Sequence, residues 1–99
     1  MKFMVRWSIR EDKWLSILKL WSEMTPQQRA DGGAGVKILG RWHDLAARGG
    51  VAILEATDLA AALRYAGQWN PHMDMVLVPV VDDEESAVIA KQVVAASAA

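Results

Sequence analysis

The sequence predicts an α+β fold in which strands and helices follow in the order β-α-β-β-α-β, with a further helix at the C-terminal end. Three observations carry this prediction. Apolar and polar residues alternate over 2–9 and over 36–42, apolar residues recur at helical spacing over 11–24, and a Gly-Gly pair lies between two apolar runs within 35–57. Alternation is typical of half-buried strands, helical spacing of amphipathic helices, and the third pattern of a β-hairpin.

The first strand is predicted over Lys2–Ile9, where Phe3, Val5, Trp7 and Ile9 share one face. A helix is predicted over Glu11–Met24 because the spacing of the apolar residues changes there, and the Thr25-Pro26 pair ends it. Its apolar face consists of Trp14, Ile17, Leu18, Trp21 and Met24. We expect the two tryptophans on this face to be core or interface residues.

A polar connection over 25–35 follows, and Pro26–Arg29 can form one further helical turn because proline suits the first position of a helix. The hairpin then consists of strands over Val36–Trp42 and Val51–Thr57, joined by a connection that carries Gly49 and Gly50. Simple alternation places Val36, Ile38, Gly40 and Trp42 on one face and Lys37, Leu39, Arg41 and His43 on the other. Gly40 inside a strand indicates a bulge or the close approach of another group.

The second half of the chain repeats the helix–strand pattern. Asp58 is predicted to cap a helix over Leu59–Ala66, which Gly67 and Asn70-Pro71 end. A strand over Met73–Val81 is apolar throughout, so we expect both of its faces to be covered, and Pro79 assigns it to an edge of the sheet. The inward stripe of the helix is predicted to consist of Leu59, Ala62, Leu63 and Ala66. A weakly amphipathic helix is predicted over about 83–96, after a run of carboxylates.

These elements predict a ferredoxin-like sandwich for residues 1–99, with an antiparallel sheet in the strand order 4-1-3-2 and helices on one face. The other face carries residues such as Leu39, Val76, Val78 and Val80, or the alternate set if the two faces are inverted, and it needs a cover. Hydrophobic residues make up 53% of the chain, which favours self-association as the way to hide apolar surface. We therefore expect a homodimer.

Composition excludes several classes of function. The formal charge is −1 and no basic stripe is visible, so we expect no nucleic-acid partner. The absence of cysteine excludes disulfides, thiolate metal sites and cysteine nucleophiles, and it fits a reducing cytoplasm. The longest apolar run, Met75–Val81, is too short to span a bilayer, and the N-terminal residues lack the pattern of a signal peptide. We expect a cytoplasmic protein without a membrane partner.

Several stretches together resemble a known family. They are Trp7-Ser8 at the end of the first strand, Val36–Asp44, the Gly49-Gly50 pair with Glu55–Asp58, Gln68-Trp69, and Pro79–Glu85. With these residues the chain resembles an uncharacterised family, a domain of unknown function, of the dimeric α+β barrel superfamily. The resemblance implies a homodimer whose two sheets close into a barrel. Related families include cofactor-independent quinone-forming monooxygenases, haem-degrading enzymes, lactone isomerases and stress-response barrels, so the resemblance implies no particular catalytic residue.

Seven residues are candidates for a ligand-binding site. Trp7, Trp42 and Trp69 each end an element and could gather at one mouth of the sheet–helix cleft, or they could simply plug the ends of a small core. The other four candidates, each with a polar or charged group, are Arg41, His43, Glu55 and His72.

The polar candidates each have a plain structural alternative. His43 beside Asp44 could be an oriented general base or an exposed strand end, and His72 could line a pocket or lie in a solvated loop. Glu55 is expected to pair with Arg6 or Arg41, or less simply to handle protons in a cavity. No metal-ligand spacing joins the histidines to Asp44, Glu55 and Asp74, and no nucleotide-binding glycine loop is present, so we predict neither a metal nor a cofactor.

Two functional hypotheses follow. In the first, a dimeric barrel binds a small apolar or aromatic molecule in each cleft, as a carrier or as an enzyme of the cofactor-independent monooxygenase or isomerase kind. In the second, the protein is a non-catalytic homodimeric module without a ligand. Haem ligation by His72 or His43 is a third, weaker possibility.

Overall fold

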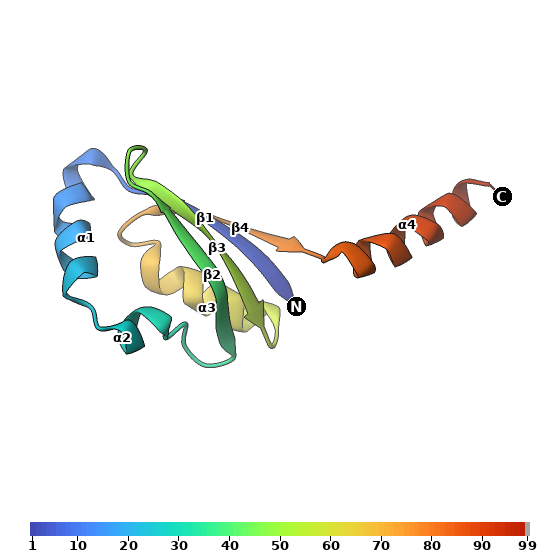
Figure 1. Cartoon of the computed structure of the whole chain (residues 1–99), viewed down its shortest axis with the longest axis horizontal. Helices are drawn as coiled ribbons and strands as arrows, with labels where there is room; N and C mark the ends of the chain where they lie inside the picture. The colour runs from blue at the N-terminus through green and yellow to red at the C-terminus, as the bar shows by residue number, and fades with distance from the viewer. Residues whose placement is uncertain (99) are drawn as a thin grey trace.

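The computed structural model describes residues 1–98, and it confirms the predicted α+β architecture (Figure 1). Within these residues four antiparallel strands form one sheet in the order β2-β3-β1-β4, which is the predicted order and that of a ferredoxin-like sandwich. The elements are β1 (Lys2–Ser8), α1 (Glu11–Glu23), α2 (Pro26–Ala30), β2 (Val36–Asp44), β3 (Gly49–Ala56), α3 (Leu59–Trp69), β4 (Asp74–Val80) and α4 (Asp83–Ser97).

The face of the sheet toward α1 and α3, called here the helix face, carries the core. The central strands β1 and β3 supply its largest fully buried side chains, Phe3, Val5 and Leu54. They pack with Ala52 and with small residues of α3, while Leu77 of β4 lies against the cluster from the edge. Because the strands alternate, every second residue of β1 and β3 points instead to the opposite face, called here the open face.

Strand β2 departs from simple alternation, and this changes which side chains reach the helix face. Ile38 pairs with Leu54 whereas Gly40 pairs with Ile53, so Leu39 is an extra residue in a β-bulge. The predicted bulge is therefore confirmed, but the predicted faces beyond it are wrong. Residues Arg41 and His43 lie on the helix face, and Gly40 and Trp42 lie on the open face.

Helix α3 is longer than predicted and turned about its axis relative to the prediction. The Asp58 carboxylate accepts a hydrogen bond from the Ala61 amide at 2.8 Å, as a helix cap should. The helix continues through Gly67 to Trp69 and has Asn70 as its C-cap, so Gly67 does not end it, whereas the predicted end at Asn70-Pro71 is confirmed. The buried residues are Ala61, Ala62, Tyr65 and Ala66, while Leu59 and Leu63 are exposed. Alanines bring the helix close to the sheet, and the large side chains of Tyr65 and Trp69 are directed inward.

Two connections also differ in detail from the sequence prediction. The optional turn after Pro26 is helix α2, which a capping box stabilises: Thr25 Oγ1 accepts from the Gln28 amide at 3.1 Å, and Gln28 Oε1 accepts from the Thr25 amide at 2.8 Å. Gly49 and Gly50 lie inside β3 rather than in the hairpin connection. The connection is 45–48, and Arg48 closes it with a left-handed φ of 56°.

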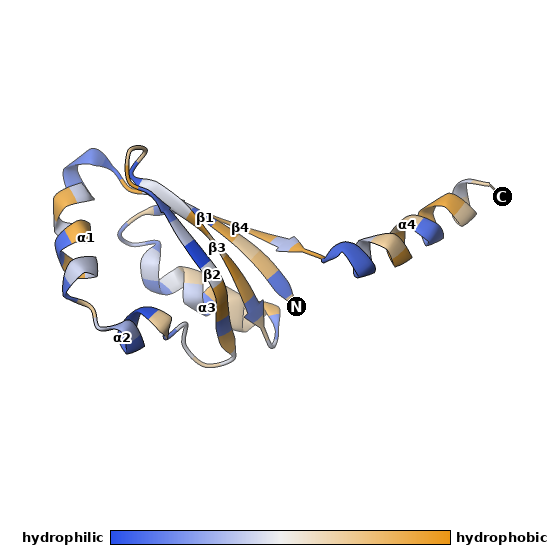
Figure 2. Ribbon diagram, in the orientation of Figure 1, coloured by the Kyte–Doolittle hydropathy of each residue, from blue (hydrophilic) through white to orange (hydrophobic). Residues whose placement is uncertain are grey.

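The open face and α4 are apolar surfaces that nothing in residues 1–98 covers. β4 lies at an edge, as Pro79 predicts, but the expectation that both of its faces are covered is wrong, because Val76 and Val78 are exposed. No residue of α4 is buried, and the helix projects from the end of β4 (Figure 1) with apolar residues along it (Figure 2). The radius of gyration is 16.5 Å, against about 13 Å for a compact chain of this length.

Ion pairs hold the root of α4 to the body. The Lys2 ammonium lies 3.8 Å from the Asp82 carboxylate and 3.9 Å from that of Glu85. Within residues 1–98 no helix combines the length and the apolar character that crossing a bilayer requires.

Candidate functional site

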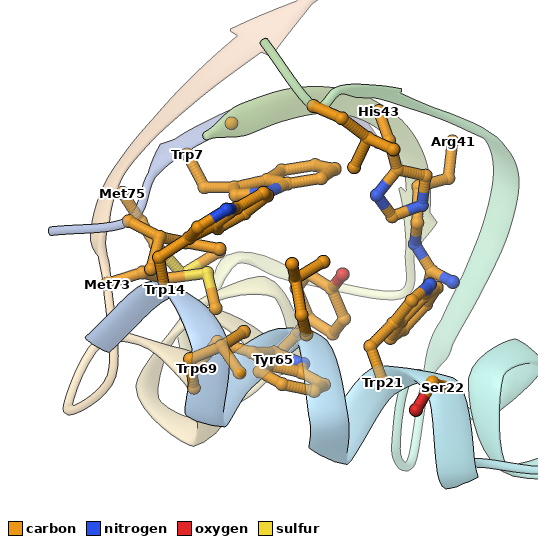
Figure 3. Close-up of a pocket in the computed structure, with 15 residues that line it drawn as sticks. Trp7, Trp14, Trp21, Ser22, Arg41, His43, Tyr65, Trp69, Met73 and Met75 are labelled. Carbon is orange, nitrogen blue, oxygen red and sulfur yellow. The ribbon is translucent and has the colours of Figure 1, made fainter. Parts of the chain in front are cut away.

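A cavity of about 310 Å³ lies between α1, the helix face of the sheet and the C-terminal end of α3 (Figure 3). Its wall is mostly aromatic, aliphatic and thioether side chains, with a few polar groups. The lining residues are Trp7, Ile9, Trp14, Ile17, Leu18, Trp21, Ser22, Arg41, His43, Leu45, Gly49, Tyr65, Trp69, Met73 and Met75. A volume at the lower end of the ~300–1,000 Å³ typical of small-molecule sites suits a ligand of one or two fused rings.

The wall on the sheet side depends on the glycine pair of β3. A Cβ atom at Gly50 would lie 2.3 Å from Cζ2 of Trp7 and 2.5 Å from the carbonyl oxygen of Trp42. A Cβ at Gly49 would lie 2.4 Å from the carbonyl oxygen of Trp7. Gly50 therefore lets the indole of Trp7 lie against the backbone of β3, where it borders the cavity, and Gly49 lets the backbones of β1 and β3 approach each other.

The opposite wall is the apolar face of α1. Trp14, Ile17, Leu18 and Trp21 follow one another at intervals of three, one and three residues, which aligns them along one side of the helix. Among them Ile17 is buried, and it packs with Ile9 in a small cluster beneath the cavity. The two tryptophans predicted as core or interface residues thus form a cavity wall.

Arg41 reaches the cavity because of the bulge in β2. Its Cζ lies 4.8 Å from the centroid of the Trp21 ring, a cation–π distance, and its Nη1 donates a hydrogen bond to the Arg29 carbonyl oxygen at 2.9 Å. Arg29 itself lies over the same ring at 5.9 Å. Two guanidinium groups therefore border Trp21, and that of Arg41 lines the cavity.

The imidazole of His43 lies beside Arg41, between two indoles. Its centroid is 5.5 Å from that of Trp7, in an edge-on arrangement of 71°, and 5.0 Å from that of Trp21. Partial burial, and secondly the positive charge of Arg41, lower the pKa of His43 below the ordinary value of 6.5. The ring is accordingly neutral at pH 7, with one nitrogen that donates and one that accepts.

Helix α3 and the start of β4 complete the site. Tyr65 is only 4% exposed, and its hydroxyl is directed toward the cavity (Figure 3). Trp69 follows one helical turn later, 6.4 Å from Trp21 between ring centroids, and Met73 and Met75 line the end away from Arg41 and His43. The sequence analysis missed Tyr65, although its spacing of four residues from Trp69 places the two side chains on one helical face.

The structure brings together Trp7, Arg41, His43 and Trp69 of the seven sequence candidates, and it separates the other three from them. Trp42 is 62% exposed on the open face, where its ring lies over Gly40. His72 is exposed after α3 and does not line the cavity.

Glu55 also lies on the open face and forms a surface ion-pair group. Its carboxylate is 3.2 Å from the N-terminal ammonium and 3.6 Å from the Lys2 ammonium, so the expected pairing with Arg6 or Arg41 is wrong. The hydrogen bond from the N-terminal ammonium, followed by the charge of Lys2, lowers the pKa of Glu55 below its ordinary value of 4.5. These contacts give Glu55 a structural role away from the cavity.

The cavity holds donors for polar groups rather than ligands for a metal. Among residues 1–98 no group of three histidine, aspartate or glutamate side chains lies close enough to share a metal ion. Besides the indole N–H groups of the tryptophans, the polar side-chain atoms at the cavity belong to Ser22, Arg41, His43 and Tyr65.

Comparison with known proteins places this architecture in a family. Residues 1–94 match the family described as Domain of unknown function (DUF3303). No curated protein and no solved structure matches the chain.

Proposed function

The chain belongs to the DUF3303 family, and from the geometry of its cavity we propose that it binds a small apolar or aromatic molecule there. One observation carries the proposal: within residues 1–98, four of the five tryptophans converge on a single cavity, together with Tyr65, Met73 and Met75. Flat aromatic walls and adaptable thioethers are the lining that planar apolar molecules prefer.

A neutral bicyclic probe tests this proposal. We expect 2-naphthol to bind with micromolar to millimolar affinity, measured by calorimetry and by the change in tryptophan fluorescence. Trp14→Ala should weaken binding about tenfold, since stacking of an aromatic pair contributes roughly 1 kcal/mol beyond the area it buries. Trp42→Ala is the matched control and should leave the affinity within about twofold. Equal losses in both variants, or no binding to the wild type, would contradict the proposal.

Catalysis in the cavity is a second candidate function, and the neutral imidazole of His43 favours it. A neutral histidine against an apolar cavity can take a proton from an acidic C–H of the ligand, and the adjacent Arg41 can stabilise the resulting anion. This is the chemistry that a cofactor-independent monooxygenase or isomerase would need at its first step.

Deuterium exchange tests for this proton transfer. The probe is 2-tetralone, an aromatic ketone with acidic C–H bonds, followed by NMR in D₂O. Exchange faster than in buffer, lost in His43→Gln and retained in His72→Gln, would support catalysis. Exchange at the rate in buffer would leave a binding site. If exchange is no faster than in buffer and 2-naphthol does not bind, the remaining interpretation is a non-catalytic homodimeric module.

The partner that we propose is a second copy of the chain, covering the open face. Val76 and Val78 are exposed on the edge strand β4, Trp42 and Leu39 are exposed on β2 at the opposite edge of the sheet, and α4 exposes Val88, Ile89, Val93 and Val94. Apolar surface of this extent on one small chain favours association. In a twofold dimer the same operation covers the open face of both protomers and brings each α4 to its partner.

Sedimentation equilibrium tests the assembly. The expected mass at micromolar concentration is twice the protomer mass of 10.9 kDa. Val78→Asp should shift the equilibrium toward the protomer, whereas Leu63→Asp, which places the same charge on the outer side of α3, should not. A chain ending at Val81 isolates the contribution of α4. A wild-type mass of 10.9 kDa would refute the dimer.

A further inference from the structure

The cavity has two chemically different ends. Trp14, Met73 and Met75 lie at one end, and Arg41 and His43 lie at the other beside Trp21 (Figure 3). The first end offers apolar rings and thioethers, with the indole N–H of Trp14 and no charged group, and the second offers the charged guanidinium of Arg41 beside the imidazole of His43. A ligand that satisfies both ends has an apolar ring and a polar head.

The positive charge at the polar end has no counter-charge within residues 1–98. The cations that form ion pairs within residues 1–98 are Lys2, Arg10 and the N-terminus. No carboxylate of these residues lies within 4.0 Å of the Arg41 guanidinium. Arg29, over the same Trp21 ring, has a buried Nε without a hydrogen-bond partner within residues 1–98. A half-buried guanidinium without an anion is costly, because both desolvation and its positive neighbour act against it.

Arg41 still has N–H donors that can bind a carboxylate. The guanidinium carbon lies over the Trp21 ring at 4.8 Å, and the Arg29 carbonyl accepts from one of the five N–H donors of the group. The remaining in-plane donors form the fork that matches the two oxygens of a carboxylate. Stacking on an indole and bidentate carboxylate binding are therefore compatible in a single arginine.

Tyr65 supplies a second polar contact. Its side chain is buried, its hydroxyl is directed into the cavity, and the side-chain hydrogen bonds of residues 1–98 do not include it. The hydroxyl is accessible from the cavity and can donate a hydrogen bond, so an oxygen atom of the ligand is a suitable partner.

From these contacts we infer that the ligand is a planar aromatic carboxylate whose carboxylate pairs with Arg41 while its ring lies among the tryptophans. The inference rests on the proposed function and narrows the class of ligand. A cationic ligand would face two uncompensated arginines. A dianionic phosphate is disfavoured because one charged side chain, Arg41, lines the cavity and His43 is neutral.

A pair of isosteric probes tests the inference. 2-Naphthoate and 2-naphthamide share the ring system and differ in the charge of the head group. At pH 7.5 we expect calorimetry to show naphthoate binding at least about tenfold more tightly than naphthamide, as charge-assisted hydrogen bonds contribute. Arg41→Gln should abolish the preference, because it removes the positive charge that distinguishes the two head groups. Arg6→Gln, which removes a positive charge from the open face, should retain the full preference.

A second readout does not require that Arg41→Gln folds. A carboxylate bound at Arg41 lies close to His43, so naphthoate should raise the midpoint of the His43 Cε1–H NMR titration, and naphthamide should not. His72→Gln assigns the signal, and Arg41→Lys, which keeps the charge without the planar fork, should lose part of the preference.

Failure of the inference is distinguishable from failure of the proposed function. If both probes bind the wild type equally, the carboxylate inference is overturned while a binding cavity stands. A preference lost equally in Arg41→Gln and Arg6→Gln would also overturn it, because the overall charge and not Arg41 would then select the anion. If neither probe nor 2-naphthol binds, the proposed function fails and the inference with it.

Discussion

Consecutive residues of one strand point to opposite faces of the sheet. The two faces differ in how deeply these residues are buried and in what covers them. In β3, Leu54 is fully buried under α3, while its neighbour Ile53 lies on the open face and remains partly exposed. On the helix face, helices and aromatic rings enclose a cavity. On the open face, valines and Trp42 meet solvent within residues 1–98. Both faces carry large apolar side chains, so hydropathy alone does not distinguish the buried core from the exposed surface.

The two faces also differ in how their charged groups are paired. On the open face, Lys2 and the N-terminus neutralise Glu55 at the surface, and Arg6 is exposed to solvent. On the helix face, Arg41 and Arg29 border Trp21 without a carboxylate among residues 1–98. Neutralised charges suit a surface of structural contacts, whereas uncompensated charge beside an apolar cavity suits recognition of an anion.

Truncation of neighbouring side chains in β3 should give the largest difference between the faces. We expect Leu54→Ala to lower the free energy of unfolding by about 3 kcal/mol, because it removes buried contacts and leaves a void in the core. Ile53→Ala should cost less than about 1 kcal/mol in an isolated protomer, where its side chain is partly solvated. Urea denaturation of both variants measures the difference.

The same pair of variants tests the dimer when the protein concentration is varied. If a second copy covers the open face, the cost of Ile53→Ala rises with concentration, because unfolding is then coupled to dissociation. The cost of Leu54→Ala should persist at every concentration. Equal costs for the two variants at the lowest concentration would contradict the assignment of faces.

A glycine lies beneath a tryptophan on each face of the sheet: Gly50 beneath Trp7 on the helix face, and Gly40 beneath Trp42 on the open face. Neither has a positive φ, so an added Cβ is unfavourable only through contact. At Gly50 the Cβ would meet the Trp7 ring and the Trp42 carbonyl oxygen, which the sheet fixes. We expect Gly50→Ala to cost about 1–3 kcal/mol, as overpacking does, and to weaken naphthol binding by displacing Trp7.

Gly40→Ala is the matched change on the open face. Its Cβ would lie 2.4 Å from Cη2 of Trp42, but that ring is exposed and can rotate away. The expected cost is within about 0.5 kcal/mol, with unchanged naphthol affinity. Thermal unfolding and calorimetry of the two variants check both statements. A larger loss for Gly40→Ala than for Gly50→Ala would show that the open-face ring is the more firmly held.

The periodicity of the sequence was sufficient to predict the sheet order and the position of most elements. Alternation in β1 and helical spacing in α1 are strong signals, and Pro79 correctly assigned β4 to an edge. The candidate site was predicted less completely because one bulged residue, Leu39, exchanges the faces of everything after it. Alternation therefore placed Trp42 and Arg41 on the wrong faces, although Gly40 marked where the bulge occurs.

The other missed feature has a different physical cause. Helix α3 is apolar nearly all round, so its sequence pattern does not specify which side faces the sheet. Close packing decides the matter in favour of Ala61 and Ala62, and Tyr65 consequently points into the cavity while Leu59 and Leu63 stay outside. Side-chain size and not hydrophobicity sets this orientation, and a hydropathy pattern carries no information about it.

The smallest expected effect concerns the pH dependence that His43 adds on the helix face. Its pKa is lowered in the folded protein, so between the ordinary value of 6.5 and the lower folded value the unfolded chain binds more protons. Stability contributed by His43 is therefore complete above pH 6.5 and is lost as the pH falls toward the folded pKa. The lowered pKa values of Glu55 and Asp82 act only below their ordinary values of 4.5 and 3.8, so they do not contribute in this window.

Urea denaturation between pH 7.5 and 5.5 measures the effect of His43. His43→Gln should lose less stability on acidification than the wild type, by a small margin because the ring is partly solvated. In the NMR titration, the His43 midpoint should lie below 6.5 and rise part of the way toward it in Arg41→Gln, since burial is the larger cause and persists. A midpoint at or above 6.5 without ligand would mean that a counter-charge already occupies the polar end of the cavity, and the contrast between the two faces would then disappear.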